Sequence, residues 1–320
     1  MNYTLRHIVG PLMFFVVMLS MTCNAEPMHA KKVIILKFAT HPALDELESN
    51  FIGSLKSRLA NVDIETLNAN GNPVSAKQLA DAATRPGVDL IVTLATPATQ
   101  AVAKTSIEPE IPLLYAAVAD PVGAHVVLKR STGIQNAGSN IVKKALETIK
   151  MIYPNAKRIG TIYNPTEQNS IFVQELIKQQ CDEMKLELVQ RTVSDPAQFQ
   201  ETVEQLSKKI DVLYSANDNL VNKGALSIAS TAKALKLPFF IGELSAVSKG
   251  AVAGVGVEYS SMGKHLGELA AIILMLKPNE PLPPRESPPV PQFWLNMPIA
   301  NEIGLVVSPR VMQMADKVLK

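Results

Sequence analysis

The chain has 320 residues, and its 31 lysines and arginines nearly balance its 29 aspartates and glutamates, which leaves a formal net charge of +2 at pH 7. A balance this close gives no electrostatic basis for binding nucleic acid or a membrane surface. The length fits one large or two medium-sized domains. Beyond the N-terminal segment, no second apolar run reaches the about 20 residues that a membrane-spanning helix needs.

Residues 1–25 have the features of a secretory signal peptide. Arg6 supplies a basic start, and residues 8–21 form an apolar run that is short for a membrane span. Ala25 ends a segment with small residues at the positions that a signal peptidase reads. We therefore expect cleavage after Ala25 and a periplasmic mature protein.

Cys23 offers the alternative of a lipoprotein signal, in which this cysteine is lipidated and holds the protein at the membrane. Such a signal needs a small residue directly before the cysteine and an aliphatic residue three positions before it. This chain has Thr22 and Ser20 there, so cleavage is favoured over lipidation. Cys181 is then the only cysteine of the mature chain, which excludes a disulfide within it.

Apolar runs of strand length alternate with amphipathic stretches of helix length. This cadence is typical of parallel sheets that are covered by helices on both faces, so the expected fold class is α/β. The expected strands are residues 33–38, 89–94, 112–118, 158–163, 186–193, 210–215 and 237–241.

Three strand-and-loop units recur in the same order, which indicates a duplicated fold. Residues 33–38 parallel 158–163, residues 88–93 parallel 210–215, and residues 110–115 parallel 236–241. Each copy is expected to form one lobe with a parallel sheet flanked by helices. We place the N-terminal lobe at 31–133 plus 260–285 and the C-terminal lobe at 134–259 plus 286–320, with three hinge crossings between them.

Polar loops follow the strands of both lobes. Ligands of open parallel sheets bind outside the carboxyl ends of the strands, and two such faces across a hinge form a cleft that closes on a ligand. The candidate ligand-binding residues are Thr40, His41, Thr96 and Asp120 in the first lobe, and Asn164, Asn169, Ser170, Asn217, Asp218 and Glu243 in the second.

The two aspartates are the candidates for holding a ligand ammonium group. Each also has a purely structural interpretation, because Asp218 is placed to N-cap the next helix and Asp120 precedes a proline in a common turn. A ligand carboxylate suits a helix N-terminus, where Thr96, Asn169 and Ser170 stand, although these residues are equally suited to plain capping.

Several segments resemble one family of transport proteins. They are THPALD at 40–45, ATPA at 95–98, AVADPVGA at 117–124, PNAKRIG at 154–160 and YNP at 163–165. Together they resemble the ABC transporter substrate-binding proteins whose better-known members bind tryptophan or tyrosine. The resemblance implies a type I periplasmic-binding fold with three hinge crossings, an aromatic amino acid as ligand, and a permease with its ATPase as partners. We expect a monomer.

Other functions remain as alternatives. The same cleft suits a sensor subunit that reports to a membrane receptor, and a branched aliphatic amino acid or a small peptide-like solute needs similar anchors. A secreted enzyme is disfavoured, because the sequence has no nucleophile elbow, no zinc-protease motif and no phosphate-binding loop. The five histidines are scattered, so we expect no metal and no cofactor.

Overall fold

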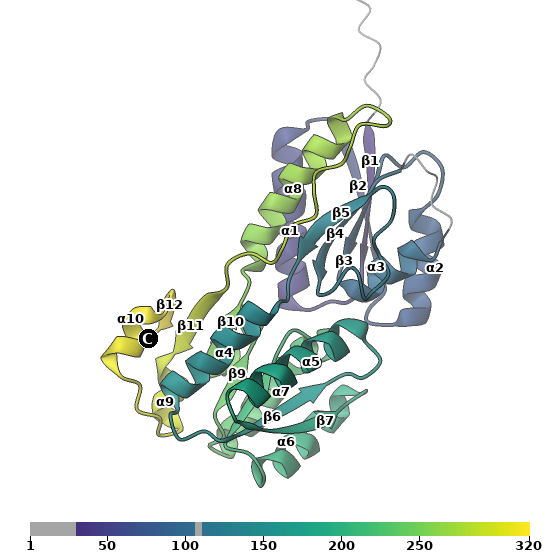
Figure 1. The fold of residues 1–320 in the computed structure, drawn as a ribbon. Coiled ribbons are helices and arrows are strands. Elements are labelled where there is room, and N and C mark those ends of the chain that lie inside the picture. The colour runs from purple at the N-terminus through teal and green to yellow at the C-terminus, as the bar shows by residue number, and fades with distance from the viewer. Residues whose placement is uncertain (1–29, 106–110) are drawn as a thin grey trace, which may run out of the picture.

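A computed structural model describes residues 30–105 and 111–320 of the chain. Two lobes lie end to end, each built on its own sheet (Figure 1). The predicted α/β fold is therefore confirmed. The predicted signal peptide, with Cys23, lies outside the described residues. Within the described ranges, no helix is long and apolar enough to cross a membrane.

The first lobe is a five-stranded sheet in the order β2-β1-β3-β4-β5, and all its neighbouring strands are parallel. The central strands β3 and β4 are buried along their whole length and β1 is buried from Val33 onward, whereas the edge strand β2 has polar residues interspersed and no buried residue. The strands are β1 (Lys31–Lys37), β2 (Val62–Asn68), β3 (Leu90–Leu94), β4 (Leu113–Val118) and β5 (Ser131–Gln135).

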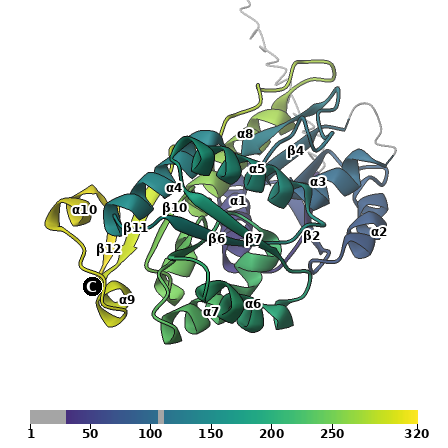
Figure 2. The same ribbon diagram turned by 60° about the horizontal axis from the view of Figure 1, so that its bottom comes forward.

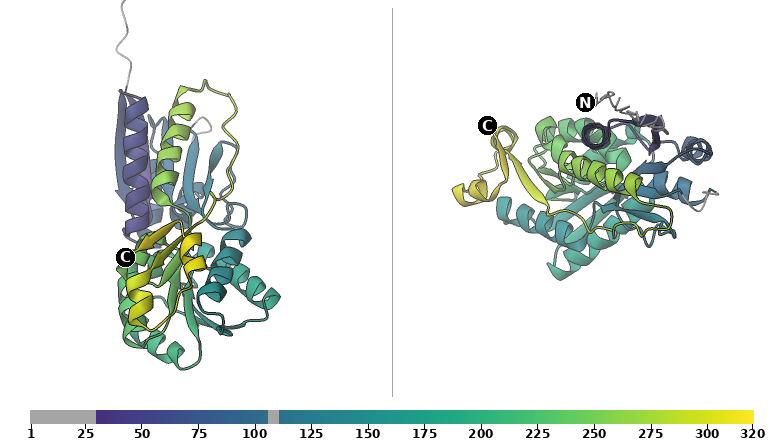
Figure 3. Two further views of the ribbon diagram at one scale, coloured as in Figure 1. Left: turned by 90° about the vertical axis from the view of Figure 1, so that its left-hand side faces the viewer. Right: turned by 90° about the horizontal axis from the view of Figure 1, so that it is seen from above.

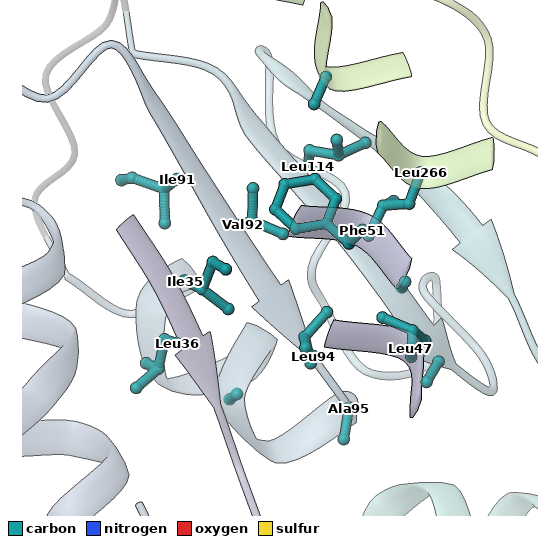
Figure 4. Close-up of a cluster of buried hydrophobic side chains, with 14 of the residues drawn as sticks. Ile35, Leu36, Leu47, Phe51, Ile91, Val92, Leu94, Ala95, Leu114 and Leu266 are labelled. Carbon is teal, nitrogen blue, oxygen red and sulfur yellow. The ribbon is translucent and has the colours of Figure 1, made fainter. Parts of the chain in front are cut away.

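Two pairs of helices cover this sheet. Helices α1 (Pro42–Arg58) and α8 (Tyr259–Met275) pack on one face, and α2 (Pro73–Ala83) and α3 (Thr96–Ala103) on the other (Figures 1 and 3). Figure 4 shows Phe51 of α1 and Leu266 of α8 beside Val92 and Leu114 of the sheet. A helix from late in the chain thus completes the core of the first lobe.

Small residues let α8 approach α1 closely. A Cβ atom on Gly263 would lie 2.3 Å from the carbonyl oxygen of Leu47, and one on Gly267 would lie 2.6 Å from the Cβ of Ser54. Because real Cβ atoms do not approach other atoms so closely, glycine is required at both contacts. The side-chain hydroxyl of Ser54 also donates a hydrogen bond to the carbonyl of Lys264.

The second lobe repeats the strand order of the first. Its strands β7-β6-β8-β9-β10 correspond to β2-β1-β3-β4-β5, which confirms the predicted duplication. One departure from an all-parallel sheet is β11, which runs antiparallel to β10 because the chain returns to this lobe from the first one. The strands are β6 (Arg158–Tyr163), β7 (Glu187–Thr192), β8 (Val212–Ser215), β9 (Phe239–Ile241), β10 (Ala253–Gly256), β11 (Gln292–Asn296) and β12 (Lys317–Leu319).

Helices again lie on both faces of the second sheet, and α5 contacts α3 of the first lobe across the junction (Figure 2). The helices are α4 (Ser139–Ile152), α5 (Gln168–Glu183), α6 (Phe199–Ser207), α7 (Asn219–Ala234), α9 (Met297–Glu302) and α10 (Pro309–Met314), with short 3-10 turns at η1 (Pro196–Gln198) and η2 (Leu244–Lys249).

The chain passes between the lobes three times, from β5 to α4, from β10 to α8 and from α8 to β11. The first and third passages are joined by backbone hydrogen bonds. The amide of Glu286 donates to the carbonyl of Gly133 (2.9 Å), and the amide of Gln135 donates to the carbonyl of Glu286 (3.1 Å). The first and third passages thus lie side by side.

Candidate functional site

The carboxyl ends of both sheets face the junction, where an open cleft has a volume of about 680 Å³. That volume lies within the usual range for small-molecule sites. Both lobes contribute to its walls, with Phe38, Ala39, Asn70, Gly71, Pro73, Lys77, Asp81, Pro97, Gln100, Ala101, Lys104 and Thr105 from the first and Asn164, Thr166, Glu167, Ser194, Pro196, Asn219, Leu220 and Lys223 from the second. We call this space the outer cleft.

A second, much smaller cavity lies deeper in the junction, and we call it the inner cavity. Its volume is about 10 Å³, close to the minimum for one water-sized group. Asn219 lines both spaces, so the inner cavity adjoins the outer cleft. The lining residues are His41, Leu44, Ala117, Ala119, Asn136, Asn169, Asn217, Asp218, Asn219, Asn222 and Tyr259.

Four asparagines that line this small cavity have unpaired side-chain oxygens. The side-chain oxygens of Asn136, Asn169, Asn217 and Asn222 are buried and accept no hydrogen bond from any described residue. Buried polar atoms are nearly always paired, so four unpaired acceptors around one cavity need a donor from elsewhere. A group with several N–H donors satisfies that need.

Glu167 stands at the start of α5, between the two spaces, and is 5% exposed. Its carboxylate accepts hydrogen bonds from the side-chain amides of Asn164 (3.1 Å), Asn169 (3.2 Å) and Asn219. Burial, followed by the nearby negative charge of Asp218, raises the pKa of Glu167 to about 7. The three amide hydrogen bonds act in the opposite direction but do not offset the burial.

Asp218 is the second buried carboxylate, and it is bound by backbone and hydroxyl groups. It N-caps α7 by accepting from the amide of Val221 (2.9 Å). Its other oxygen accepts from the amide of Asn164 (2.7 Å) and the hydroxyl of Ser170 (2.6 Å). The predicted capping role of Asp218 is therefore present, and Ser170 serves to hold this carboxylate.

Neither carboxylate has a positively charged partner in the described part of the chain. Among the salt bridges of the described residues, none involves Glu167 or Asp218. Burying an unpaired carboxylate costs several kcal/mol, because the charge loses its hydration without gaining a counter-charge. A cationic group bound at this site would therefore be stabilised by both carboxylates.

His41 connects the lobes at the edge of the inner cavity. Its Nδ1 atom accepts from the amide of Leu44 (3.5 Å), so its Nε2 atom carries the proton and donates to the side-chain oxygen of Asn219 (3.3 Å). Burial lowers the pKa of His41 to about 4. The imidazole is therefore neutral near pH 7 and supplies no counter-charge to Glu167.

Of the predicted site residues, the outer cleft or the inner cavity is lined by Asn164, Asn169, Asn217, Asp218 and His41. Ser170 lines neither space but donates to Asp218, and the other four lie outside both spaces. Thr40 is exposed and accepts a hydrogen bond from Asn68, and buried Thr96 accepts from the amide of Ala119. Asp120 accepts from the amides of Val122 and Gly123 within its own turn.

Glu243, the last of these four, is buried and N-caps η2 by accepting from the amides of Ser245 and Ala246.

Sequence reasoning missed Glu167, Asn219, Asn136 and Asn222. The sequence did contain an indication for Glu167. It is an acidic residue directly before a predicted helix, and its neighbours Asn164, Asn169 and Ser170 are potential hydrogen-bond donors.

The comparisons with known proteins agree with this architecture. Residues 32–319 match the family described as ABC transporter substrate binding protein. The chain is 30% identical to a tyrosine-binding protein of Clostridioides difficile (strain R20291), over 76% of this chain and 72% of that one.

Two solved structures share the fold closely. One is an ABC domain from Streptococcus pneumonia in complex with L-Trp, which is 26% identical, covers 91% of this chain and 100% of its own, and has a TM-score of 0.84. The other is the ligand-free, open structure of a substrate-binding protein with adhesive properties from Clostridium difficile, which is 28% identical, covers 91% and 99%, and has a TM-score of 0.67. With its family match spanning nearly all the described residues, the chain belongs to the ABC transporter substrate-binding proteins.

Proposed function

We propose that this protein binds a small molecule with a protonated amino group between its lobes and delivers it to an ABC permease and its ATPase. The observation that carries the proposal is the pair of buried carboxylates, Glu167 and Asp218, which form no salt bridge with any basic residue that the structure describes. A ligand ammonium group at the inner cavity supplies the missing charge, and its N–H groups supply donors for the unpaired oxygens of the four asparagines.

An amino acid with an aromatic side chain is the ligand class that this site supports best. The outer cleft has apolar walls that include Phe38, Pro97 and Leu220, and these offer contact area for a ring. The tyrosine-binding and tryptophan-bound relatives support the same class. Tyrosine and tryptophan both have the amino and carboxylate groups that all α-amino acids share.

Closure of the lobes about the three passages is the expected mode of binding. We infer lobe boundaries at 31–133 plus 260–285 and at 134–259 plus 286–320. The better superposition on the tryptophan-bound relative than on the open one supports a closed arrangement here, since the two relatives have similar identity to this chain. The hydrogen bond between His41 and Asn219 crosses the junction and stabilises that arrangement.

ABC transporter substrate-binding proteins work outside the cytoplasm, and this family is one of solute binding and not of catalysis. We propose that the mature protein is a periplasmic monomer without catalytic activity, released by cleavage after Ala25. Mass spectrometry of the protein exported by its host tests this step. An N-terminus that follows Ala25 supports it, and a lipid-modified Cys23 overturns it.

Calorimetric titration with tyrosine, tryptophan, phenylalanine and leucine tests the ligand class, with Glu167→Gln as the diagnostic variant. Removing one member of a buried charge pair costs about 2–5 kcal/mol, so the dissociation constant should rise about thirtyfold or more. Glu175→Gln is the matched control, because Glu175 lies on the exposed side of the same helix. Equal affinity of Glu167→Gln and the parent would show that Glu167 does not hold the ammonium group.

A further inference from the structure

Lys223 lines the outer cleft one helical turn after Asn219. Both residues lie on α7, and residues four positions apart stand on the same face of a helix, with their Cβ atoms about 5–6 Å apart. The side-chain amide of Asn219 donates to the carboxylate of Glu167. Because a long side chain in a helix leans toward the turn before it, the expected direction of the Lys223 side chain is toward Asn219 and thus toward that carboxylate.

The charge of Lys223 has no partner in the described part of the chain. The residue is exposed and takes part in none of the salt bridges found there. Lys223 and Glu167 also form no ion pair with each other, although both line the outer cleft. The second lobe therefore presents two unpaired groups of opposite charge to one space.

This spacing suits the two charges of a single α-amino acid. Its nitrogen and its carboxylate carbon are two bonds apart, about 2.5 Å, so their partners must lie on neighbouring parts of one wall. An extended lysine side chain, about 6 Å long, spans the one-turn separation between Lys223 and Asn219. Leu220, which follows Asn219, also lines the cleft and offers contact for an apolar side chain. One turn of α7 thus carries contacts for the ammonium group, the side chain and the carboxylate.

The other two lysines of the outer cleft do not have this relation to Glu167. Lys77 lies in α2 and Lys104 follows α3, so both belong to the first lobe. Among the described residues, the hydrogen-bond partners of Glu167 all come from the second lobe, and neither lysine bonds to them. Lys104 is exposed like Lys223 and lines the same cleft, so it provides a control for the charge alone.

We propose that Lys223 binds the α-carboxylate of the ligand while Glu167 binds its ammonium group, so that the protein selects free amino acids over amines that lack a carboxylate. The inference rests on the proposed function, because it takes the position of the ammonium group from there. The helix N-termini expected from the sequence are less suited to the carboxylate. Thr96 lines neither space, and Ser170 lines neither and donates to Asp218.

Calorimetric titration with two matched pairs of probes tests the inference: tyrosine with tyrosinol, and tryptophan with tryptophanol. Each alcohol keeps the ring and the ammonium group and has a neutral hydroxymethyl group in place of the carboxylate. The parent should bind each amino acid at least about tenfold more tightly than its alcohol, the lower end for a hydrogen bond between charged groups. Lys223→Gln should reduce this preference to about threefold or less, by weakening the binding of the amino acid far more than that of the alcohol.

Lys104→Gln is the matched control, because it removes the same charge from the same cleft, and it should keep most of the preference. Alcohols that bind the parent as tightly as the amino acids would overturn the inference. So would a preference that survives Lys223→Gln, or one that falls equally in both variants, since the carboxylate would then be bound elsewhere or attracted by the overall charge of the cleft.

Glu167→Gln separates this inference from the proposed function. It should weaken the binding of amino acids and alcohols alike, because all four probes have the ammonium group. That result together with an unchanged preference in Lys223→Gln would overturn the role of Lys223 and leave the proposed function in place. Absence of binding by all four probes would overturn both.

Discussion

Replacing Glu167 with glutamine should change the stability of the ligand-free protein in a way that depends on pH. The pKa of Glu167 is raised to about 7 in the folded protein, from an ordinary value of 4.5. The folded state therefore holds its proton more tightly than the unfolded state does, and stability falls as the pH rises from 4.5 to 7. Below pH 4.5 the carboxyl is neutral in both states and carries no penalty.

The size of the effect follows from two opposing contributions. A pKa difference of about 2.5 units corresponds to about 3 kcal/mol, which glutamine recovers above pH 7 because it is never charged. Glutamine also replaces one acceptor oxygen with an amide nitrogen, so one of the three hydrogen bonds from Asn164, Asn169 and Asn219 is lost, at about 1 kcal/mol. The variant should be about 2 kcal/mol more stable than the parent at pH 8 and about 1 kcal/mol less stable at pH 4.

Urea denaturation of the parent, Glu167→Gln and Glu175→Gln between pH 4 and pH 8.5 measures this change directly. The difference between the parent and Glu167→Gln should reverse its sign within that range, whereas Glu175→Gln should follow the parent throughout. A difference that is the same at every pH would refute the reasoning, because it would mean that Glu167 ionises alike in the folded and unfolded states.

Three further predictions concern neighbouring features. Gly267→Ala should destabilise the protein by about 1–3 kcal/mol in chemical denaturation, because its new methyl group overlaps Ser54, whereas Gly53→Ala has nothing within 4 Å and should be neutral or stabilising. Asp218→Asn should keep its cap but leave the amide of Asn164 unpaired, with a loss of about 1–3 kcal/mol in the same assay; an unchanged stability would contradict this. Ligand binding should release a proton near pH 7 as the ammonium group lowers the pKa of Glu167, so affinity should fall as the pH drops from 7 to 6; calorimetry in buffers of different ionisation enthalpy would contradict the prediction if no proton were released.

Much of the fold could be predicted from the sequence, because its central strands are continuous apolar runs. The run at 33–38 corresponds to β1, and the run at 158–163 coincides with β6. The edge strand β2 was missed, since half of its residues are polar and solvent covers one side of it. The strand β5 is absent from the predicted strands, because it is short and contains Gly133.

The site was only partly predictable, because its decisive property is not local. Capping of α7 by Asp218 follows from adjacent residues, so the sequence indicated it. The two further bonds to Asp218 come from residues about 50 positions earlier, so its neighbours along the chain do not indicate them. Glu167 also accepts a hydrogen bond from Asn219, which lies 52 positions later in the chain, and no local spacing indicates that contact.

The position of α8 also governs the order in which this protein can acquire its structure. Five strands of the first sheet are complete by Gln135, but the helix that covers Leu47 and Phe51 does not begin until Tyr259. The second sheet likewise waits for β11 and β12, which end at Leu319. A chain that emerges from a membrane N-terminus first can therefore close neither core until almost all of it has crossed, so we expect both lobes to gain protection from proteases together and late.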